Sequence, residues 1–333
     1  MKNITLADVA KEAHVSIATV SRALNQKGHV SEEKTRRIEA AIKKLDYRYP
    51  GGKIGSKASE KNVLLMVIPS LSNPFYNEII NGFQYTAMNR NYETLLCQSI
   101  SNKMRMDLYL DSLRKKTISG AAVLDASVKY KEYLPIVGSF PLIQCCEYHD
   151  DLHSPYVAIN NSAAAKIAVI HLYSVGYRKI AMLNARLSFR YARERLKGYQ
   201  EALKEINLSY EQKWVVSVQD ISYSLALSVA ENLLSQPDRP DAVFAVSDVL
   251  AAAVIKAAKR LKIKVPDELG VIGFDNTEIS LMCDPSISTM NQPRFEIGSY
   301  ACNMLIDQIN QLKGTNQNLI LDTELIVRES TLR

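Results

Sequence analysis

Several patterns that would define an enzyme or a membrane protein are missing from the sequence. No apolar run is long enough to cross a membrane, and 47% hydrophobic with 23% charged residues is ordinary for a soluble globular chain. The five cysteines form no C-x-x-C pair and share no ligand spacing with the five histidines. We therefore expect reduced cysteines, no metal and no cofactor. G-x-S-x-G, Walker A and G-x-G-x-x-G motifs are also absent, which argues against an enzyme.

The chain of 333 residues is long enough for two or three domains. Residues 1–4 lead directly into the first expected helix, so we expect no secretory leader and a cytoplasmic protein. A solute-binding protein of the periplasm, which would need such a leader, is therefore a weaker hypothesis.

Charge is distributed unevenly along the chain. Residues 1–61 carry 13 Lys and Arg against 7 Asp and Glu, whereas residues 62–333 carry 28 of each. The whole net charge of +6 therefore lies in the first segment. A basic module ahead of a neutral body is typical of phosphate binding. A solvated basic tail is the alternative, but this segment also has apolar residues at helical spacing.

Residues 5–25 predict two short helices joined by a tight turn. Thr5 and Asp8 resemble a capping box at the start of the first helix, and Ser16 caps the second. His14 lies in the turn, where it tolerates a left-handed conformation better than a β-branched residue does. The core positions of the two helices are Leu6, Val9, Ala10, Ala13, Val20, Ala23 and Leu24.

The other face of the second helix carries Ile17, Ala18, Ser21, Arg22 and Asn25, and no acidic residue. A guanidinium suits a guanine edge, small apolar groups suit thymine methyls, and hydroxyl and amide groups suit phosphates. A helix of this composition fits the major groove of DNA. The expected DNA-binding residues are Thr5, Ser16, Ile17, Ala18, Thr19, Ser21, Arg22 and Asn25.

Residues 15–25, VSIATVSRALN, match the pattern V-S-x-x-T-V-S-R-x-L-N. This pattern resembles the headpiece signature of the lactose-repressor (LacI/GalR) family. The resemblance implies a non-enzymatic transcriptional repressor that binds operator DNA as a homodimer and answers to a small-molecule effector. It would be nucleoid-associated when bound to DNA. An ordinary helix pair without DNA function is the alternative interpretation.

A third helix is predicted from Ser31 to about Leu45, so the headpiece spans residues 1–46. Residues 47–61 read as a flexible linker with three glycines and three lysines. Most members of the family form a hinge helix here, but each glycine disfavours a helix by about 1 kcal/mol relative to alanine. We expect no stable hinge helix, lysine contacts with phosphates, and loosely enforced half-site spacing.

From residue 62 onward, buried strands alternate with amphipathic helices in two rounds. Such alternation predicts parallel sheets covered on both faces, and thus an α/β core of two lobes. This core, residues 62–333, resembles the periplasmic-binding-protein-like core of the family. We expect one lobe at about 62–161 and 291–320, with a helix near 103–116, and the other at 162–290 and 321–333. A return crossing at 288–293 would lead to a helix near 294–313.

Small molecules bind beyond the carboxyl ends of parallel strands, so residues that follow strands are candidate ligands. Phe75 and Tyr76 can stack on a planar ring, although both would also fit as packing under their helix. Arg195 and Asp275 resemble a family pair that binds sugar hydroxyls; an interlobe ion pair is the alternative. The resemblance further implies Phe189, Tyr191, Ile221 and Ser247, which sit where family members line the pocket. The expected effector-binding residues are therefore Phe75, Tyr76, Asn160, Phe189, Tyr191, Arg195, Ile221, Ser247 and Asp275.

Residues 283–298 and the glycine-bearing linker most resemble a nucleoside-responsive branch of the family. The resemblance implies an effector such as cytidine, release from DNA on effector binding, and joint DNA binding with the cyclic-AMP receptor protein. Purine- and sugar-responsive repressors are the alternatives. The two-lobed core would be the bistable element, and without a terminal heptad repeat we expect a dimer and no tetramer.

Overall fold

The computed structural model describes residues 5–25, 30–45, 47, 62–99, 118–124, 140–149, 154–312 and 317–332. The chain separates into two compact units, Met1–Lys61 and Asn62–Arg333. The predicted linker, apart from residue 47, and the helix near 103–116 lie outside the described residues, as does the side chain of Asn25.

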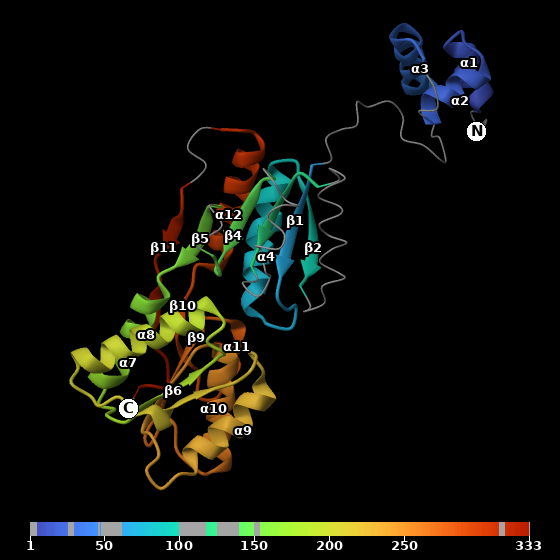
Figure 1. The fold of residues 1–333 in the computed structure, drawn as a ribbon. Coiled ribbons are helices and arrows are strands. Elements are labelled where there is room, and N and C mark those ends of the chain that lie inside the picture. The colour runs from blue at the N-terminus through green and yellow to red at the C-terminus, as the bar shows by residue number, and fades with distance from the viewer. Residues whose placement is uncertain are drawn as a thin grey trace. The chain divides into compact units, whose positions relative to one another are not determined.

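The first unit contains three helices, α1 (Leu6–Glu12), α2 (Ile17–Asn25) and α3 (Glu32–Leu45) (Figure 1). The Asp8 carboxylate accepts hydrogen bonds from the Thr5 amide at 2.8 Å and the Thr5 hydroxyl at 2.7 Å. His14 has φ of 52°, the left-handed turn expected from the sequence. The three helices enclose a small apolar core made of Val9, Ala10, Ala13, Val20, Leu24, Ile38, Ala41 and Ile42.

The second unit is built on two six-stranded sheets with the same topology. The first sheet contains β1 (Val63–Ile68), β2 (Glu93–Gln98), β3 (Gly120–Val123), β4 (Leu142–Cys145), β5 (Tyr156–Ile159) and β11 (Leu319–Leu321). The second contains β6 (Ile180–Asn184), β7 (Val215–Ser217), β8 (Ala242–Ala245), β9 (Gly270–Asp275), β10 (Ser288–Asn291) and β12 (Glu324–Ile326). Their orders are β11-β5-β4-β3-β1-β2 and β12-β10-β9-β8-β6-β7.

All strand pairs are parallel except β10 with β12. The first strand of each sheet, β1 or β6, has the second strand on one side and the third strand on the other. The strand order therefore reverses there, which creates a topological switch point. The fold class predicted from the sequence is confirmed, with one antiparallel edge strand as a refinement. The repeated topology supplies two strand ends at which one ligand can bind.

Helices connect the strands and return the chain to the first lobe (Figure 1). They are α4 (Phe75–Asn89), α7 (Asn161–Ser174), α8 (Arg190–Glu205), α9 (Tyr223–Leu234), α10 (Asp248–Arg260), α11 (Glu278–Met282) and α12 (Arg294–Ile309), with a 3-10 turn at Gln212–Trp214. Helices α12 and α4 are in close contact where glycines leave room for the other helix. A Cβ added at Gly82 would overlap the Phe295 backbone, and one added at Gly298 would overlap the Ile79 backbone. This contact fixes the returning helix on the first lobe.

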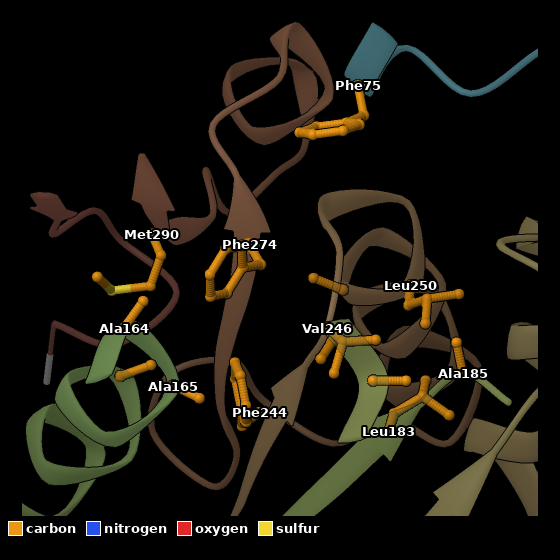
Figure 2. Packing of buried hydrophobic residues seen from close by; sticks show 14 of the residues in the cluster. Phe75, Ala164, Ala165, Leu183, Ala185, Phe244, Val246, Leu250, Phe274 and Met290 are labelled. Atoms are coloured by element: carbon orange, nitrogen blue, oxygen red, sulfur yellow. The ribbon is translucent and has the colours of Figure 1, made fainter. Parts of the chain in front are cut away.

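The centre of the second sheet is fully buried. Figure 2 shows Phe244 and Phe274 on neighbouring strands, and their ring centroids lie 6.4 Å apart. Every residue of β6, β8 and β9 is buried, which explains their continuous apolar sequences. The structure differs from expectation at residues 288–291, which form a strand of this sheet before the chain crosses, and at α11, which was not predicted.

No helix in the part of the chain that the structure describes has the length and apolar character needed to span a membrane.

Candidate functional site

A cavity of about 740 Å³ lies within the second unit, lined by residues that follow strands of both sheets. Its volume falls in the range of small-molecule sites. Eight of the nine residues expected to bind effector line it: Phe75, Tyr76, Phe189, Tyr191, Arg195, Ile221, Ser247 and Asp275. The two switch points therefore open into a single cavity, as the topology requires.

Asn160 is the exception, because it is not among the residues that line the cavity. Its side chain caps α7, where Oδ1 accepts a hydrogen bond from the Ala163 amide at 3.0 Å. The next residue, Asn161, lines the cavity, and its Oδ1 accepts from Arg195 Nε at 2.9 Å. An effector contact by Asn160 stays a prediction.

Arg195 lies at the buried end of the cavity with 5% of its surface exposed. Its guanidinium stacks on Phe274 with 3.5 Å between Cζ and the ring centroid, and Nη1 donates to the Val246 carbonyl at 2.6 Å. Nη1 also lies 3.8 Å from Asp275 Oδ1. These partners hold the guanidinium plane in one orientation, so its remaining N–H donors have fixed directions.

Asp275 occupies the end of β9 in an unusual backbone conformation, with φ of 106°. Asp and Asn tolerate positive φ better than most residues. Gln292, which follows β10, donates from Nε2 to Asp275 Oδ1 at 2.7 Å. Burial raises the pKa of Asp275 to about 7, against the opposing effect of Arg195. The carboxylate is therefore a strong acceptor when ionised.

Aromatic residues from both lobes line the cavity. Phe75 and Tyr76 begin α4, with ring centroids 5.1 Å apart and planes at 70°. Phe189 and Tyr191 lie at the start of α8 and stack at 5.5 Å and 19°. A guanidinium also lies over each ring of the second pair, with Arg195 Cζ 5.0 Å from the Tyr191 centroid and Arg186 Cζ 5.3 Å from the Phe189 centroid.

Glu147, which sequence analysis did not single out, joins the lobes beside this cavity. It follows β4 of the first lobe, and its carboxylate accepts from the amides of Arg190 and Tyr191, both at 2.8 Å, in the first turn of α8. Its neighbour Tyr148 lies under the Arg190 guanidinium, with 3.7 Å between Cζ and the ring centroid. Tyr148 also stacks on Tyr156 at 3.7 Å. We call Glu147, Tyr148 and Arg190 the interlobe clasp.

Asn161 and Gln292 are among the other cavity residues that sequence analysis missed. The rule that ligands follow parallel strands would have found Glu147 and Gln292, because they follow β4 and β10. Nothing local in the sequence marks their partners, since Glu147 bonds to a helix more than forty positions along.

The face of α2 expected to meet DNA is exposed. Ile17, Ala18 and Arg22 are exposed, with Thr19 and Ser21 half-buried, while Val20 and Leu24 face the core. Ser16 Oγ accepts from the Thr19 amide at 3.2 Å and so caps the helix, and exposed Thr5 belongs to the cap of α1. Ile17 exposes 52% of its surface beside Arg22, which leaves an apolar group available to a thymine methyl.

Together, a helix-turn-helix unit with an exposed basic reading face and a two-lobed core with a ligand cavity define a ligand-responsive DNA-binding regulator. Family comparisons agree. Residues 5–49 match the model of bacterial regulatory proteins of the lacI family, and residues 169–331 match a periplasmic binding protein-like domain.

The chain belongs to the LacI family of bacterial transcriptional regulators, which are not enzymes. It is 34% identical to the HTH-type transcriptional repressor CytR of Escherichia coli (strain K12), covering 98% of this chain and 96% of CytR. It is 32% identical to the ribose operon repressor of Halalkalibacterium halodurans, covering 98% and 97%. A solved complex of the transcriptional regulator CelR with cellobiose superimposes with a TM-score of 0.75 at 26% identity, covering 98% of this chain and 99% of that one.

Proposed function

We propose that this regulator is a repressor whose operator binding is controlled by a nucleoside such as cytidine. One observation carries the proposal: aromatic rings from both lobes share a cavity with a fixed guanidinium and carboxylate. Arg195 and Asp275 would hold the ribose hydroxyls, since each hydroxyl both donates and accepts. Phe75, Tyr76, Phe189 and Tyr191 would then hold the base.

Ribose is the closest competing effector, because it presents the same hydroxyls without a base. The likeness to ribose operon repressors favours it as the second candidate. The four cavity aromatics favour the nucleoside, because free ribose has no planar ring for them to stack on. Purines form a third class of ligand that the same rings accommodate.

Calorimetry with cytidine, adenosine, hypoxanthine and ribose tests this assignment on the full chain. Cytidine or adenosine should bind at least about tenfold more tightly than ribose, because stacking contributes about 1–3 kcal/mol per base. Binding of ribose alone would make the chain a sugar-responsive repressor. Binding of hypoxanthine but no nucleoside would place it with purine-responsive repressors.

Release from DNA is the expected direction of the response. Occupation of the cavity would shift the relation of the two lobes, and the ligand weakens operator binding only through different affinities for the two states. Electrophoretic mobility shift with selected operator and random duplex, at several salt concentrations, checks this. A specific repressor shows sequence preference and a steep salt dependence. Joint binding with the cyclic-AMP receptor protein stays a prediction.

A homodimer forms part of this proposal, because two headpieces would match a near-palindromic operator. Helices α4, α11 and α12 expose large apolar residues, namely Tyr85, Met88, Leu281, Met282, Phe295 and Tyr300. Such surfaces are typical of protein interfaces. In analytical ultracentrifugation the chain should sediment as a dimer and Met282→Glu should weaken it. A monomer at micromolar concentration would contradict the proposal.

A further inference from the structure

Glu147 gives the cavity a second buried carboxylate besides Asp275, and its carboxylate bonds to the backbone of the α8 residue that carries one of the cavity rings. It lines the cavity with only 7% of its surface exposed, and it follows Cys146, whose φ of 63° turns the chain after β4. Its carboxylate bonds to the amide of Tyr191, whose ring stacks on Phe189. An acceptor therefore lies next to the surface on which a base would stack.

An ionised carboxylate only accepts hydrogen bonds, and it has about four acceptor positions. Among the described residues, the amides of Arg190 and Tyr191 occupy two of them, one on each oxygen. These amides belong to the first turn of α8, and the positive end of a helix favours the ionised form. Burial has the largest effect and raises the pKa of Glu147. The amides of Tyr191 and Arg190 and the charges of Arg195 and Arg193 act in the opposite direction.

The clasp prevents this carboxylate from turning away from a ligand. Tyr148 is held between the Arg190 guanidinium and the Tyr156 ring, at 3.7 Å from each. Arg190 Nε in turn donates to Glu194 Oε1 at 2.6 Å. Because the residue beside Glu147 is fixed on both sides, the acceptor has one orientation before any ligand arrives, which favours discrimination.

We propose that Glu147 selects nucleosides whose base carries an exocyclic amino group and rejects those with a carbonyl at the same position. The inference rests on the proposed nucleoside function. An amino group, as in cytosine or adenine, donates to the carboxylate, as Glu does to cytosine N4 in DNA recognition. The carbonyl of uracil or hypoxanthine would place an acceptor against an acceptor in a buried site, which loses a bond and adds repulsion.

Calorimetric titration of the full chain with matched pairs, cytidine against uridine and adenosine against inosine, tests the selection. The amino member of each pair should bind at least about tenfold more tightly, as expected for a hydrogen bond to a charged group. Equal affinities within both pairs would overturn the inference while leaving the nucleoside function intact. Absence of binding by all four would instead remove the proposed function on which it rests.

Glu147→Gln tests selection through the ratio of affinities within a pair. Its NH2 group cannot accept from one of the two α8 amides, so the affinities of both members can fall, but it can donate to a carbonyl and so changes their ratio. The preference for the amino member should fall to less than about threefold. Tyr148→Leu is the matched control, since it loosens the same clasp and keeps the carboxylate. It should weaken both members of a pair and lower their ratio less than Glu147→Gln does, because the carboxylate is still present.

If Glu147→Gln weakened both members equally and kept their ratio, Glu147 would only position α8 and the inference would fail. Should that variant not fold, the ratios of the unmodified protein decide the question by themselves.

Discussion

The two recognition surfaces of this chain are built in opposite ways. On α2, Ile17, Ala18 and Arg22 are exposed, and Arg22 Nε donates to the Ala18 carbonyl of its own helix at 3.4 Å. In the core, Arg195, Asp275 and Glu147 are buried and bonded to fixed partners. On our proposal, the cavity side chains have fixed positions before the effector binds, whereas the side chains of α2 take up fixed positions only on the duplex.

Charge separates the regions in the same way. All the net positive charge lies in residues 1–61, and the rest of the chain is neutral. Binding to phosphates should therefore depend on salt and on the first unit, while binding of an uncharged nucleoside should not. Four predictions test this division.

The largest effect should come from Arg22→Ala. A bidentate arginine–guanine contact contributes about 1–3 kcal/mol of discrimination at each half-site, so the preference for operator over random duplex should largely disappear. Competition binding measures this ratio. Arg36→Ala is the matched control, because Arg36 is an exposed arginine on α3 that pairs with Glu32 at 3.7 Å. If Arg22→Ala kept the parental preference, the reading face would be wrongly assigned.

Asp275→Asn should act only on the core. Asn tolerates the positive φ, so the fold should survive, but loss of the charge should weaken nucleoside binding about 10- to 100-fold. Operator preference without ligand should stay unchanged. Asp238→Asn, which alters an exposed carboxylate paired with Lys179 and Lys213, is the control and should change neither property. An unchanged cytidine affinity in Asp275→Asn would remove Asp275 from the ligand site.

Nucleoside affinity should depend on pH through Asp275. Its pKa is raised to about 7, mainly by burial, with Asp248 raising it and Arg195, Gln292 and Arg294 lowering it. The ionised form accepts more strongly and at more positions than the protonated form, so affinity should fall as pH falls below about 7, by at most about tenfold per pH unit. Calorimetry from pH 5.5 to 8.5 should show this slope, and Asp275→Asn should flatten it. Equal slopes in both proteins would assign the titration to another group.

The smallest effect concerns operator spacing. If residues 47–61 form no hinge helix, moving the half-sites apart by one base pair should weaken binding less than about fivefold, because a flexible linker adapts at little entropic cost. Replacing Gly51, Gly52 and Gly55 with alanine should make spacing matter more. A sharp collapse of binding in the unmodified protein would show that the linker orders on DNA.

Local patterns predicted most of this architecture. Strand β1 reads as a continuous apolar run because both faces of its sheet are covered, and α2 follows from caps and helical spacing. Helix α11 was missed because five residues carry too little periodicity. The sequence pattern did not distinguish Asn160, which caps α7, from Asn161, which lines the cavity, because the two amides are neighbours.

The clasp was beyond local reasoning for a different reason. Glu147 follows a strand like other cavity residues, but its partner is the start of a helix in the other lobe. Only the folded chain brings the two together, and Tyr148 gains its role from Arg190 in the same way. Contacts between distant elements therefore set the chemistry of the site, while the elements themselves follow from sequence.

On our proposal, a ligand in the core cavity controls operator binding by the headpiece. Calorimetry of cytidine binding with and without saturating operator DNA tests it most directly, because coupling between two binding sites is reciprocal. We predict that operator weakens cytidine binding by the same factor by which cytidine weakens operator binding, about 5- to 150-fold. If cytidine bound equally well to the free and the operator-bound protein, the two binding sites would be independent. Cytidine would then not control operator binding.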